Sequence, residues 1–128
     1  MPSSVNLRTI AGRQTTAGAA EETLNLSLDG SAPAASISVP AGQVIIISGW
    51  VVTAEAPARF RFQQASGSGF FDISYLRVAA DGTVGLTDYG TVSIQIVGGV
   101  GVSFRVRVES PAGATPVTVA MRGYTEPI

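Results

Sequence analysis

Histidine, cysteine and lysine are all absent from the 128 residues of this sequence, and each absence excludes a class of chemistry. Without histidine and cysteine, these residues form no Ser-His-Asp or Cys-His catalytic centre, no His/Cys zinc site and no disulfide. Without lysine they form no Schiff base. We therefore predict a protein that is not an enzyme, with no catalytic residue, no cofactor and no metal site.

Charged side chains are scarce as well. They make up 13% of the residues, against 45% hydrophobic residues and a mean hydropathy of +0.33. Soluble domains contain about 25% charged residues on average. A soluble protein with so few charges is expected to cover part of its surface with partner protein, so we interpret the chain as a building block that forms a homo-oligomer.

The charge pattern and the apolar runs exclude two further partners. The net charge is −1, and the arginines and acids are scattered singly, so no clustered basic surface is available for a phosphate backbone. The most apolar stretch, residues 44–52, is interrupted by Ser48 and Gly49 and is shorter than the ~20 residues of a membrane helix. We predict neither nucleic acid nor membrane as a partner.

A pair of carboxylates could still support glycoside hydrolysis. The candidates are Glu55, Asp72, Asp81, Asp88 and Glu109. They are too scattered to nominate a pair, and no Asp-x-Asp-x-Asp-Gly spacing indicates a calcium loop. A carboxylate hydrolase therefore stands as the third of three hypotheses.

Apolar residues recur with a period of two along the chain, which is typical of strands with one buried face. Turn signals such as Asp29-Gly30 and Pro40-Ala41-Gly42 separate the runs, and no stretch has helical periodicity. The pattern predicts an all-β fold, a single antiparallel β-sandwich of jelly-roll type with eight to ten short strands. The predicted core is Leu24, Leu26, Val44, Ile46, Phe60, Phe62, Ile73, Tyr75, Val92, Ile94, Phe104, Val106, Val119 and Met121.

The first part of the chain, residues 1–22, is small and polar and is predicted to be an extended arm that contacts another chain, with the sandwich spanning residues 23–128. On this interpretation the sandwich would remain folded without residues 1–20. The alternative is that Val5, Leu7 and Ile10 belong to a strand of the same domain. The candidate interface residues of this segment are Val5, Leu7, Arg8, Ile10 and Arg13.

Two Arg-x-Arg pairs, Arg59 with Arg61 and Arg105 with Arg107, project from strand faces opposite the buried side chains. They are candidate interface residues for an acidic partner, because arginine is enriched at interfaces. The alternative is a solvated face in which these arginines pair with Glu109, Asp72 or Glu55.

The aromatic residues allow a second hypothesis, a carbohydrate-binding or adhesin head domain. A sugar could stack on a platform built from Trp50, Tyr75, Tyr89 and Tyr124. Core or subunit-interface positions are the preferred interpretation of these rings, because Trp50 follows the apolar run of residues 44–47.

The lysine- and cysteine-free composition, the small-residue arm before Thr23, the sandwich from Thr23 to Thr125 and the closing strand of residues 116–124 together resemble phage proteins that decorate capsids. They also resemble, more loosely, the jelly-roll domains of viral structural proteins. The resemblance is one of architecture and composition, so it transfers no functional residue. It implies a non-enzymatic virion protein, made in the host cytoplasm and often trimeric, that binds a capsid lattice and stabilises the shell.

Overall fold

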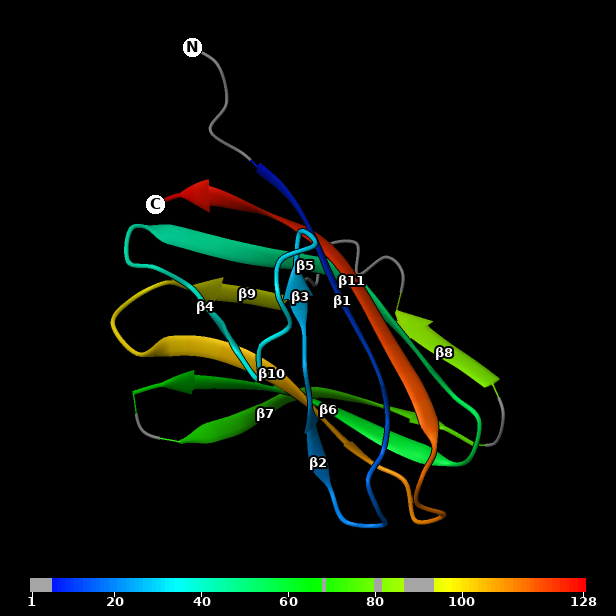
Figure 1. Ribbon diagram of the computed structural model, residues 1–128. Coiled ribbons are helices and arrows are strands. Elements are labelled where there is room, and N and C mark those ends of the chain that lie inside the picture. The colour runs from blue at the N-terminus through cyan, green and yellow to red at the C-terminus, as the bar shows by residue number, and fades with distance from the viewer. Residues whose placement is uncertain (1–5, 68, 80–81, 87–93) are drawn as a thin grey trace.

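The chain forms two antiparallel β-sheets that pack face to face, as the computed structural model shows (Figure 1). The structure describes residues 6–67, 69–79 and 94–128 in full and the backbone of residues 82–86. No helix occurs in these described residues, and none therefore is long and apolar enough to cross a membrane. The predicted all-β sandwich is confirmed.

The strands alternate between the two sheets from β1 to β6; β7 then stays in the second sheet, β8 and β9 both belong to the first, β10 to the second and β11 to the first. The first sheet contains, in spatial order, β3 (Ser27–Leu28), β1 (Asn6–Thr15), β11 (Pro116–Pro127) and β5 (Gln43–Ala54), with β8 (Gly82–Leu86) and β9 (Ile94–Val97) both paired to β5. The second sheet contains β2 (Glu22–Leu24), β10 (Val102–Glu109), β6 (Ala58–Ser66) and β7 (Phe70–Val78), with β4 (Ile37–Ser38) also paired to β10. The jelly-roll type of this sandwich stays a prediction.

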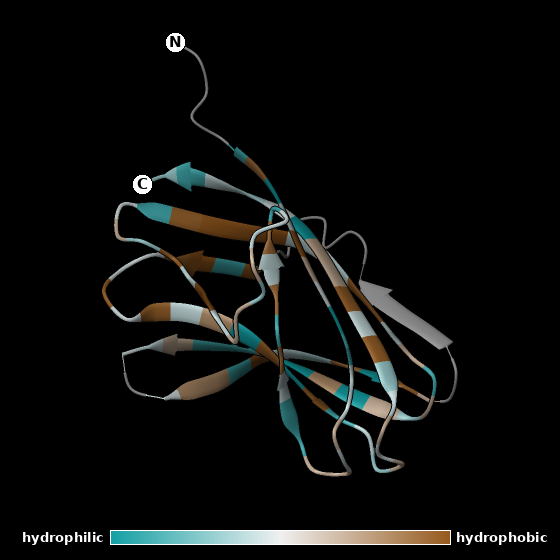
Figure 2. Cartoon of the chain, in the orientation of Figure 1, coloured by the Kyte–Doolittle hydropathy of each residue, from teal (hydrophilic) through white to brown (hydrophobic). Residues whose placement is uncertain are grey.

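Aromatic rings fill the space between the sheets. Phe62 stacks on Phe104 with ring centroids 5.3 Å apart, and Trp50 meets the edge of Phe62 at 6.0 Å. All three side chains are almost completely buried. Figure 2 shows the corresponding run of apolar residues along β5, the strand that lies between β11 and the pair β8 and β9.

Most of the predicted core is confirmed by burial in a single apolar cluster. These residues are Leu24, Leu26, Phe60, Phe62, Ile94, Phe104, Val106, Val119 and Met121. Ile46 is buried but lies outside this cluster, Val44 is half-buried, and Val92 lies outside the described residues. The predictions for Ile73 and Tyr75 are wrong, because both side chains are exposed.

A β-bulge explains the error in β7. Phe62 pairs with Ser74 and Gln63 with Asp72, so Ile73 is an extra residue in β7. The alternation of side chains reverses at such a residue. Leu76 is therefore buried, while Tyr75 points to solvent.

A second bulge determines which side of β5 faces the core. Gly123 pairs with Ile47 and Arg122 with Gly49, which leaves Ser48 without a partner residue in β11. Ile45 and Ile47 face the core before the bulge, and Trp50, Val52 and Ala54 face it after the bulge. A strict alternation along this strand, which ignores the bulge, therefore assigns Val44 and Ile46 to the core in place of Ile45 and Ile47.

The N-terminal segment is a strand of the sandwich. All ten residues of β1 pair with β11, from Asn6 with Thr125 to Thr15 with Pro116. The prediction that residues 1–22 form an arm outside the sandwich is therefore wrong for residues 6–15, and the single-domain alternative describes them. The reason is that β1 forms backbone hydrogen bonds with β11 on the side away from β5, an edge that would otherwise be unpaired. Contact of this segment with another chain stays a prediction.

Both β8 and β9 pair with β5, β9 with its first half and β8 with its second. In the second sheet, β6 and β7 pair antiparallel with each other.

Candidate functional site

Five of the eight arginines project from the outer face of the second sheet. This surface, called the arginine face below, consists of Arg59, Arg61, Arg77, Arg105 and Arg107 with Glu21, Gln63, Asp72 and Glu109. The arginines lie there because they alternate with residues that are buried in the core, such as Phe60 and Val106. The structure thus brings together the two Arg-x-Arg pairs that the sequence singles out.

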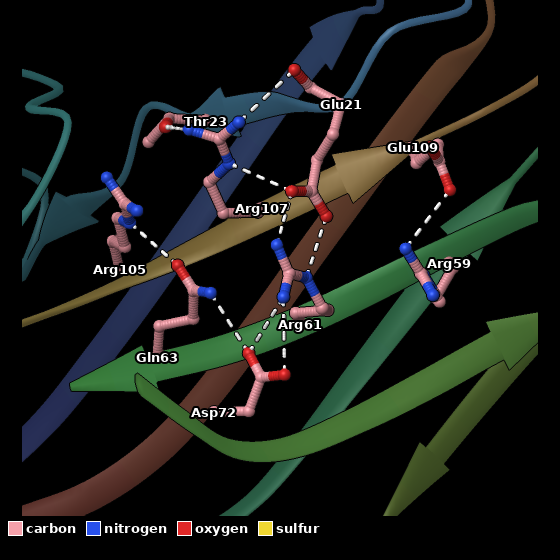
Figure 3. Close-up of polar contacts among 9 residues, drawn as sticks. All are labelled: Glu21, Thr23, Arg59, Arg61, Gln63, Asp72, Arg105, Arg107 and Glu109. Atoms are coloured by element: carbon pink, nitrogen blue, oxygen red, sulfur yellow. Dashed lines mark hydrogen bonds and ion pairs between the residues drawn. The ribbon is translucent and has the colours of Figure 1, made fainter. Parts of the chain in front are cut away.

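Arg61 is the most connected residue of the arginine face (Figure 3). Its Nε donates to Glu21 Oε2 at 2.7 Å, and its Nη2 bonds Glu21 Oε1. On the other side its Nη1 donates to both carboxylate oxygens of Asp72, at 3.1 and 3.2 Å. One arginine therefore joins an acid that precedes β2 to an acid on β7, across the width of the sheet.

The neighbouring arginines are also paired. Arg107 Nε lies 3.5 Å from Glu21 Oε1, and Arg59 Nη2 donates to Glu109 Oε1 at 3.2 Å. Glu109 and Asp72 are two of the three acids expected as partners, whereas Glu55 is exposed and bonds to none of the described arginines. Glu21 is a partner that the sequence analysis missed, because it lies outside the strands whose alternation identified the others.

Arg105 differs from Arg59, Arg61 and Arg107 because no carboxylate among the described residues pairs with it, a property that it shares with Arg77, which lies over the Tyr75 ring. The Nε of Arg105 donates to Gln63 Oε1 at 2.8 Å, and Gln63 Nε2 donates in turn to Asp72 Oδ1 at 2.9 Å. The guanidinium carbon lies 3.7 Å from the centre of the Phe70 ring, which is a close cation–π contact. The side chain is therefore oriented by an amide and a ring.

The pKa shifts follow from these contacts. The hydrogen bond from Arg61 lowers the pKa of Glu21 despite the opposing effect of burial, and the hydrogen bond from Gln63 lowers the pKa of Asp72 in the same way. The bond to Glu21 raises the pKa of Arg61. Burial lowers the pKa of Arg105, and the charges of Arg107 and Arg61 lower it further. The charge of Glu21 acts in the opposite direction and raises the pKa of Arg105.

The candidate interface residues of the N-terminal segment do not form one surface. Leu7 is 85% exposed and Arg13 is exposed on the outer face of the first sheet. Arg8 faces the other way and donates to Asp29 Oδ2 at 2.6 Å. The prediction for Ile10 is wrong, because its side chain is 1% exposed and belongs to the core. Val5 lies outside the described residues.

The aromatic residues do not form the platform considered for a sugar. Trp50 is buried in the core, as the preferred interpretation predicts. Tyr75 lies on the second sheet at the arginine face, and Tyr124 lies on the first sheet, so the two rings are on different faces of the sandwich. Tyr89 lies outside the described residues.

The carboxylates considered for catalysis are also apart. Asp72 and Glu109 each bind an arginine, and the described residues contain no group of three acids that could hold a metal ion. Asp81 and Asp88 lie outside the described residues.

Exposed apolar side chains gather at one end of the sandwich. The loop between β9 and β10 is fixed against the turn between β4 and β5, since Gly98 N bonds Gln43 O at 2.7 Å and Gly99 N bonds Val39 O at 3.1 Å. The backbone N of Ile128 bonds Gly42 O at 3.0 Å in the same place. We call this surface the apolar end; its exposed residues are Pro40, Val97, Val100, Pro127 and Ile128.

The sequence carried one signal for the apolar end. Val100 stands between Gly99 and Gly101 in a loop and is 98% exposed, where a polar residue would be expected. Figure 2 shows the apolar character of this loop. Large exposed apolar patches on soluble proteins mark interaction surfaces.

The fold is similar to that of a subunit from a study of Bacillus endospore appendages, which are described as a novel family of disulfide-linked pili. The TM-score is 0.55 at 8% sequence identity, and the similarity covers 100% of this chain and 92% of that chain. A chain of PirA is similar at a TM-score of 0.47 and 12% identity, over 88% of this chain and 92% of that one. No protein-family model and no curated protein sequence matches the chain. At 8% identity, the likeness to the appendage subunit shows the fold alone.

Proposed function

We propose that this chain is a non-enzymatic structural subunit that assembles with further copies of itself. The observation that carries the proposal is the apolar end, where Val97, Val100 and Ile128 are 59%, 98% and 74% exposed. Burial of these side chains against another subunit removes apolar surface from water, which stabilises an assembly. The shortage of charged residues agrees with a protein that covers part of its surface in this way.

Capsid decoration is the specific form of this function that we propose, with the protein on the virion surface and a trimer as the oligomer. A decoration protein stabilises a shell by mass action, since binding only to the assembled lattice favours that state by RT ln(1 + [L]/Kd). No catalytic residue is needed for this effect.

A surface filament is a second candidate, and the similarity of fold to an appendage subunit favours it. The appendages of that subunit are described as disulfide-linked, whereas these 128 residues contain no cysteine. Disulfides between these residues would therefore not link the copies, and we propose that non-covalent contacts at the apolar end join them. The separation of Tyr75 from Tyr124 disfavours the carbohydrate-binding alternative.

Light scattering coupled to size-exclusion chromatography tests the proposal. The purified protein is expected to be larger than one chain, and the double substitution Val97→Ser with Val100→Ser should shift it to the monomer. The control is Ala19→Ser with Ala112→Ser, two exposed alanines in loops at the opposite end of the sandwich. A wild-type protein that stays monomeric at high concentration would contradict self-assembly.

Electron microscopy separates the two forms. A filament would appear in the purified protein alone, whereas a decoration protein would appear as discrete oligomers that bind saturably to an undecorated particle. Decoration should also raise the temperature at which that particle breaks open; binding without this rise would contradict stabilisation of the shell.

A further inference from the structure

Arg105 lies at one end of the arginine face, in the row that contains Gln63 and Asp72, with part of its hydrogen-bonding capacity unused. It lies on β10, with β6 beside it and β7 beyond (Figure 3). Gln63 engages its Nε and Phe70 covers one side of its plane. Among the described residues, no carboxylate bonds the two Nη atoms, which form the fork that binds a carboxylate bidentately.

The acids of the arginine face are already engaged. Glu21 is shared by Arg61 and Arg107, Asp72 bonds Arg61, and Glu109 bonds Arg59. Arg59, Arg61 and Arg107 therefore each have a counter-ion within the chain, whereas Arg105 and Arg77 form no ion pair with the described acids. An oxyanion placed at the Arg105 fork would meet a guanidinium that bonds no carboxylate of the described residues and that Gln63 and Phe70 already hold in place.

The surrounding surface fits a protein better than a small ligand or a polyanion. The outer face of a β-sheet presents rows of side chains, while small ligands bind in concave pockets. The arginines alternate with three acids, unlike the uniformly basic surface that binds a phosphate backbone. Exposed Tyr75 and Ile73 on the neighbouring β7 add apolar area beside the charges. Arginine and tyrosine are among the residues that contribute most to protein interfaces.

A second copy of this chain does not offer a matching acidic surface in its described part. Asp29 is paired with Arg8, and Glu22 accepts hydrogen bonds from Gln14 Nε2 and the backbone N of Ala17. Glu55 follows β5 and Glu126 pairs with Val44 at its other end, so these two acids are far from each other. Among the acids that the structure describes, a different protein is therefore the better-matched partner.

We propose that the arginine face binds carboxylate side chains on the surface of a different protein, and that Arg105 makes the main contact. The inference deepens the proposed function and rests on it, since it assigns a second surface, distinct from the apolar end, for attachment of the assembly to its particle or neighbour.

Fluorescence anisotropy with labelled poly-L-glutamate at low salt tests this assignment. Arg105→Gln should weaken binding about tenfold, because a hydrogen bond to a charged group is lost together with a full charge. Arg105→Lys, which keeps the charge but not the planar fork, should lie between this variant and the wild type. Arg13→Gln removes the same charge from the opposite sheet and should bind as the wild type does. Thermal melts confirm that all three variants fold.

Three results would overturn the proposal. Equal losses for Arg13→Gln and Arg105→Gln would show general charge attraction without a site. Tighter binding of heparin or of duplex DNA, with the same dependence on Arg105, would assign the face to a polyanion. No binding of poly-L-glutamate at low salt would show that the face takes no carboxylates.

Light scattering keeps this inference separate from the proposed function. Arg105→Gln should leave the homo-oligomer intact, because the apolar end is unchanged. If the wild-type protein is a monomer that still binds poly-L-glutamate through Arg105, the assembly proposal fails and the assignment of the arginine face stands.

Discussion

Phe104 tests the core at the scale of a single residue. Its ring is fully buried and stacks on Phe62, so Phe104→Ala should reduce the free energy of unfolding by about 3 to 5 kcal/mol. Tyr75→Ala is the control, since Tyr75 is 59% exposed and its truncation should cost less than about 0.5 kcal/mol. Denaturant melts measure both. A smaller loss for Phe104→Ala than for Tyr75→Ala would mean that the faces of the second sheet are assigned the wrong way round.

Three carboxylates make the stability of the fold sensitive to acid. The pKa values of Glu21, Asp29 and Asp72 are all lowered in the folded protein, chiefly by hydrogen bonds from Arg61, from the backbone of Thr9 and from Gln63 respectively. A lowered folded pKa gives stability that is complete above the unfolded pKa, near 4, and that is lost as the pH falls through the folded value.

The expected result is a free energy of unfolding that is level from neutral pH to about pH 5 and then decreases. Glu21→Gln should make this decrease at low pH, the acid limb, less steep, because the side chain at position 21 no longer takes up a proton on unfolding. Glu55→Gln is the matched control and should leave the limb as it is, since Glu55 is exposed and pairs with none of the described arginines. Urea melts across the pH range measure the effect; an acid limb as steep in Glu21→Gln as in the wild type would contradict the role of this carboxyl.

At the scale of the strand, the sequence predicted the type of fold well and the faces of strands less well. A period of two is a local property, and it correctly placed Phe60 and Phe104 in the core. The bulges at Ser48 and Ile73 depend on pairing with other strands, β11 and β6. The sequence of a single strand carries no signal for these bulges, so Ile73 and Tyr75 were assigned to the wrong face.

The same distinction applies to the candidate site. Alternation with buried residues was enough to place Arg61 and Arg107 on one face of a sheet. Register between distant strands decides which acids they meet, so Glu21, 40 residues from Arg61 in the sequence, could not be identified. The apolar end likewise depends on hydrogen bonds between loops that are far apart in the chain.

The pairing of β1 with β11 gives a prediction for truncation. Removing residues 1–15 should unfold the protein, because it deletes the buried Ile10 and leaves ten residues of β11 without a neighbour on one side. Removing only residues 1–5 should leave the fold unchanged, since all ten pairs between β1 and β11 in the described part of the chain would remain. Circular dichroism and thermal melts distinguish the two. A truncated protein lacking residues 1–15 that still melts cooperatively near the wild-type temperature would restore the interpretation of this segment as a separable arm.

At the scale of the whole molecule, the two surfaces proposed for binding differ in chemistry. The apolar end is formed by loops, and the arginine face by the regular strands of the second sheet. Apolar burial depends weakly on salt, whereas contacts between exposed charges are screened by it. Added salt should therefore release an acidic partner while the homo-oligomer persists.

Concentration should control the thermal stability of an assembly held together in this way. A partner subunit that binds only the folded chain raises its melting temperature by mass action, so the melting temperature should increase with protein concentration. Val97→Ser with Val100→Ser should abolish this dependence and leave the melting temperature of the dilute protein unchanged, because both side chains are exposed in the single chain. Arg105→Gln should keep the dependence. Differential scanning calorimetry over a wide concentration range measures it, and a melting temperature that is independent of concentration in the wild type would show that folding and assembly are not coupled through the apolar end.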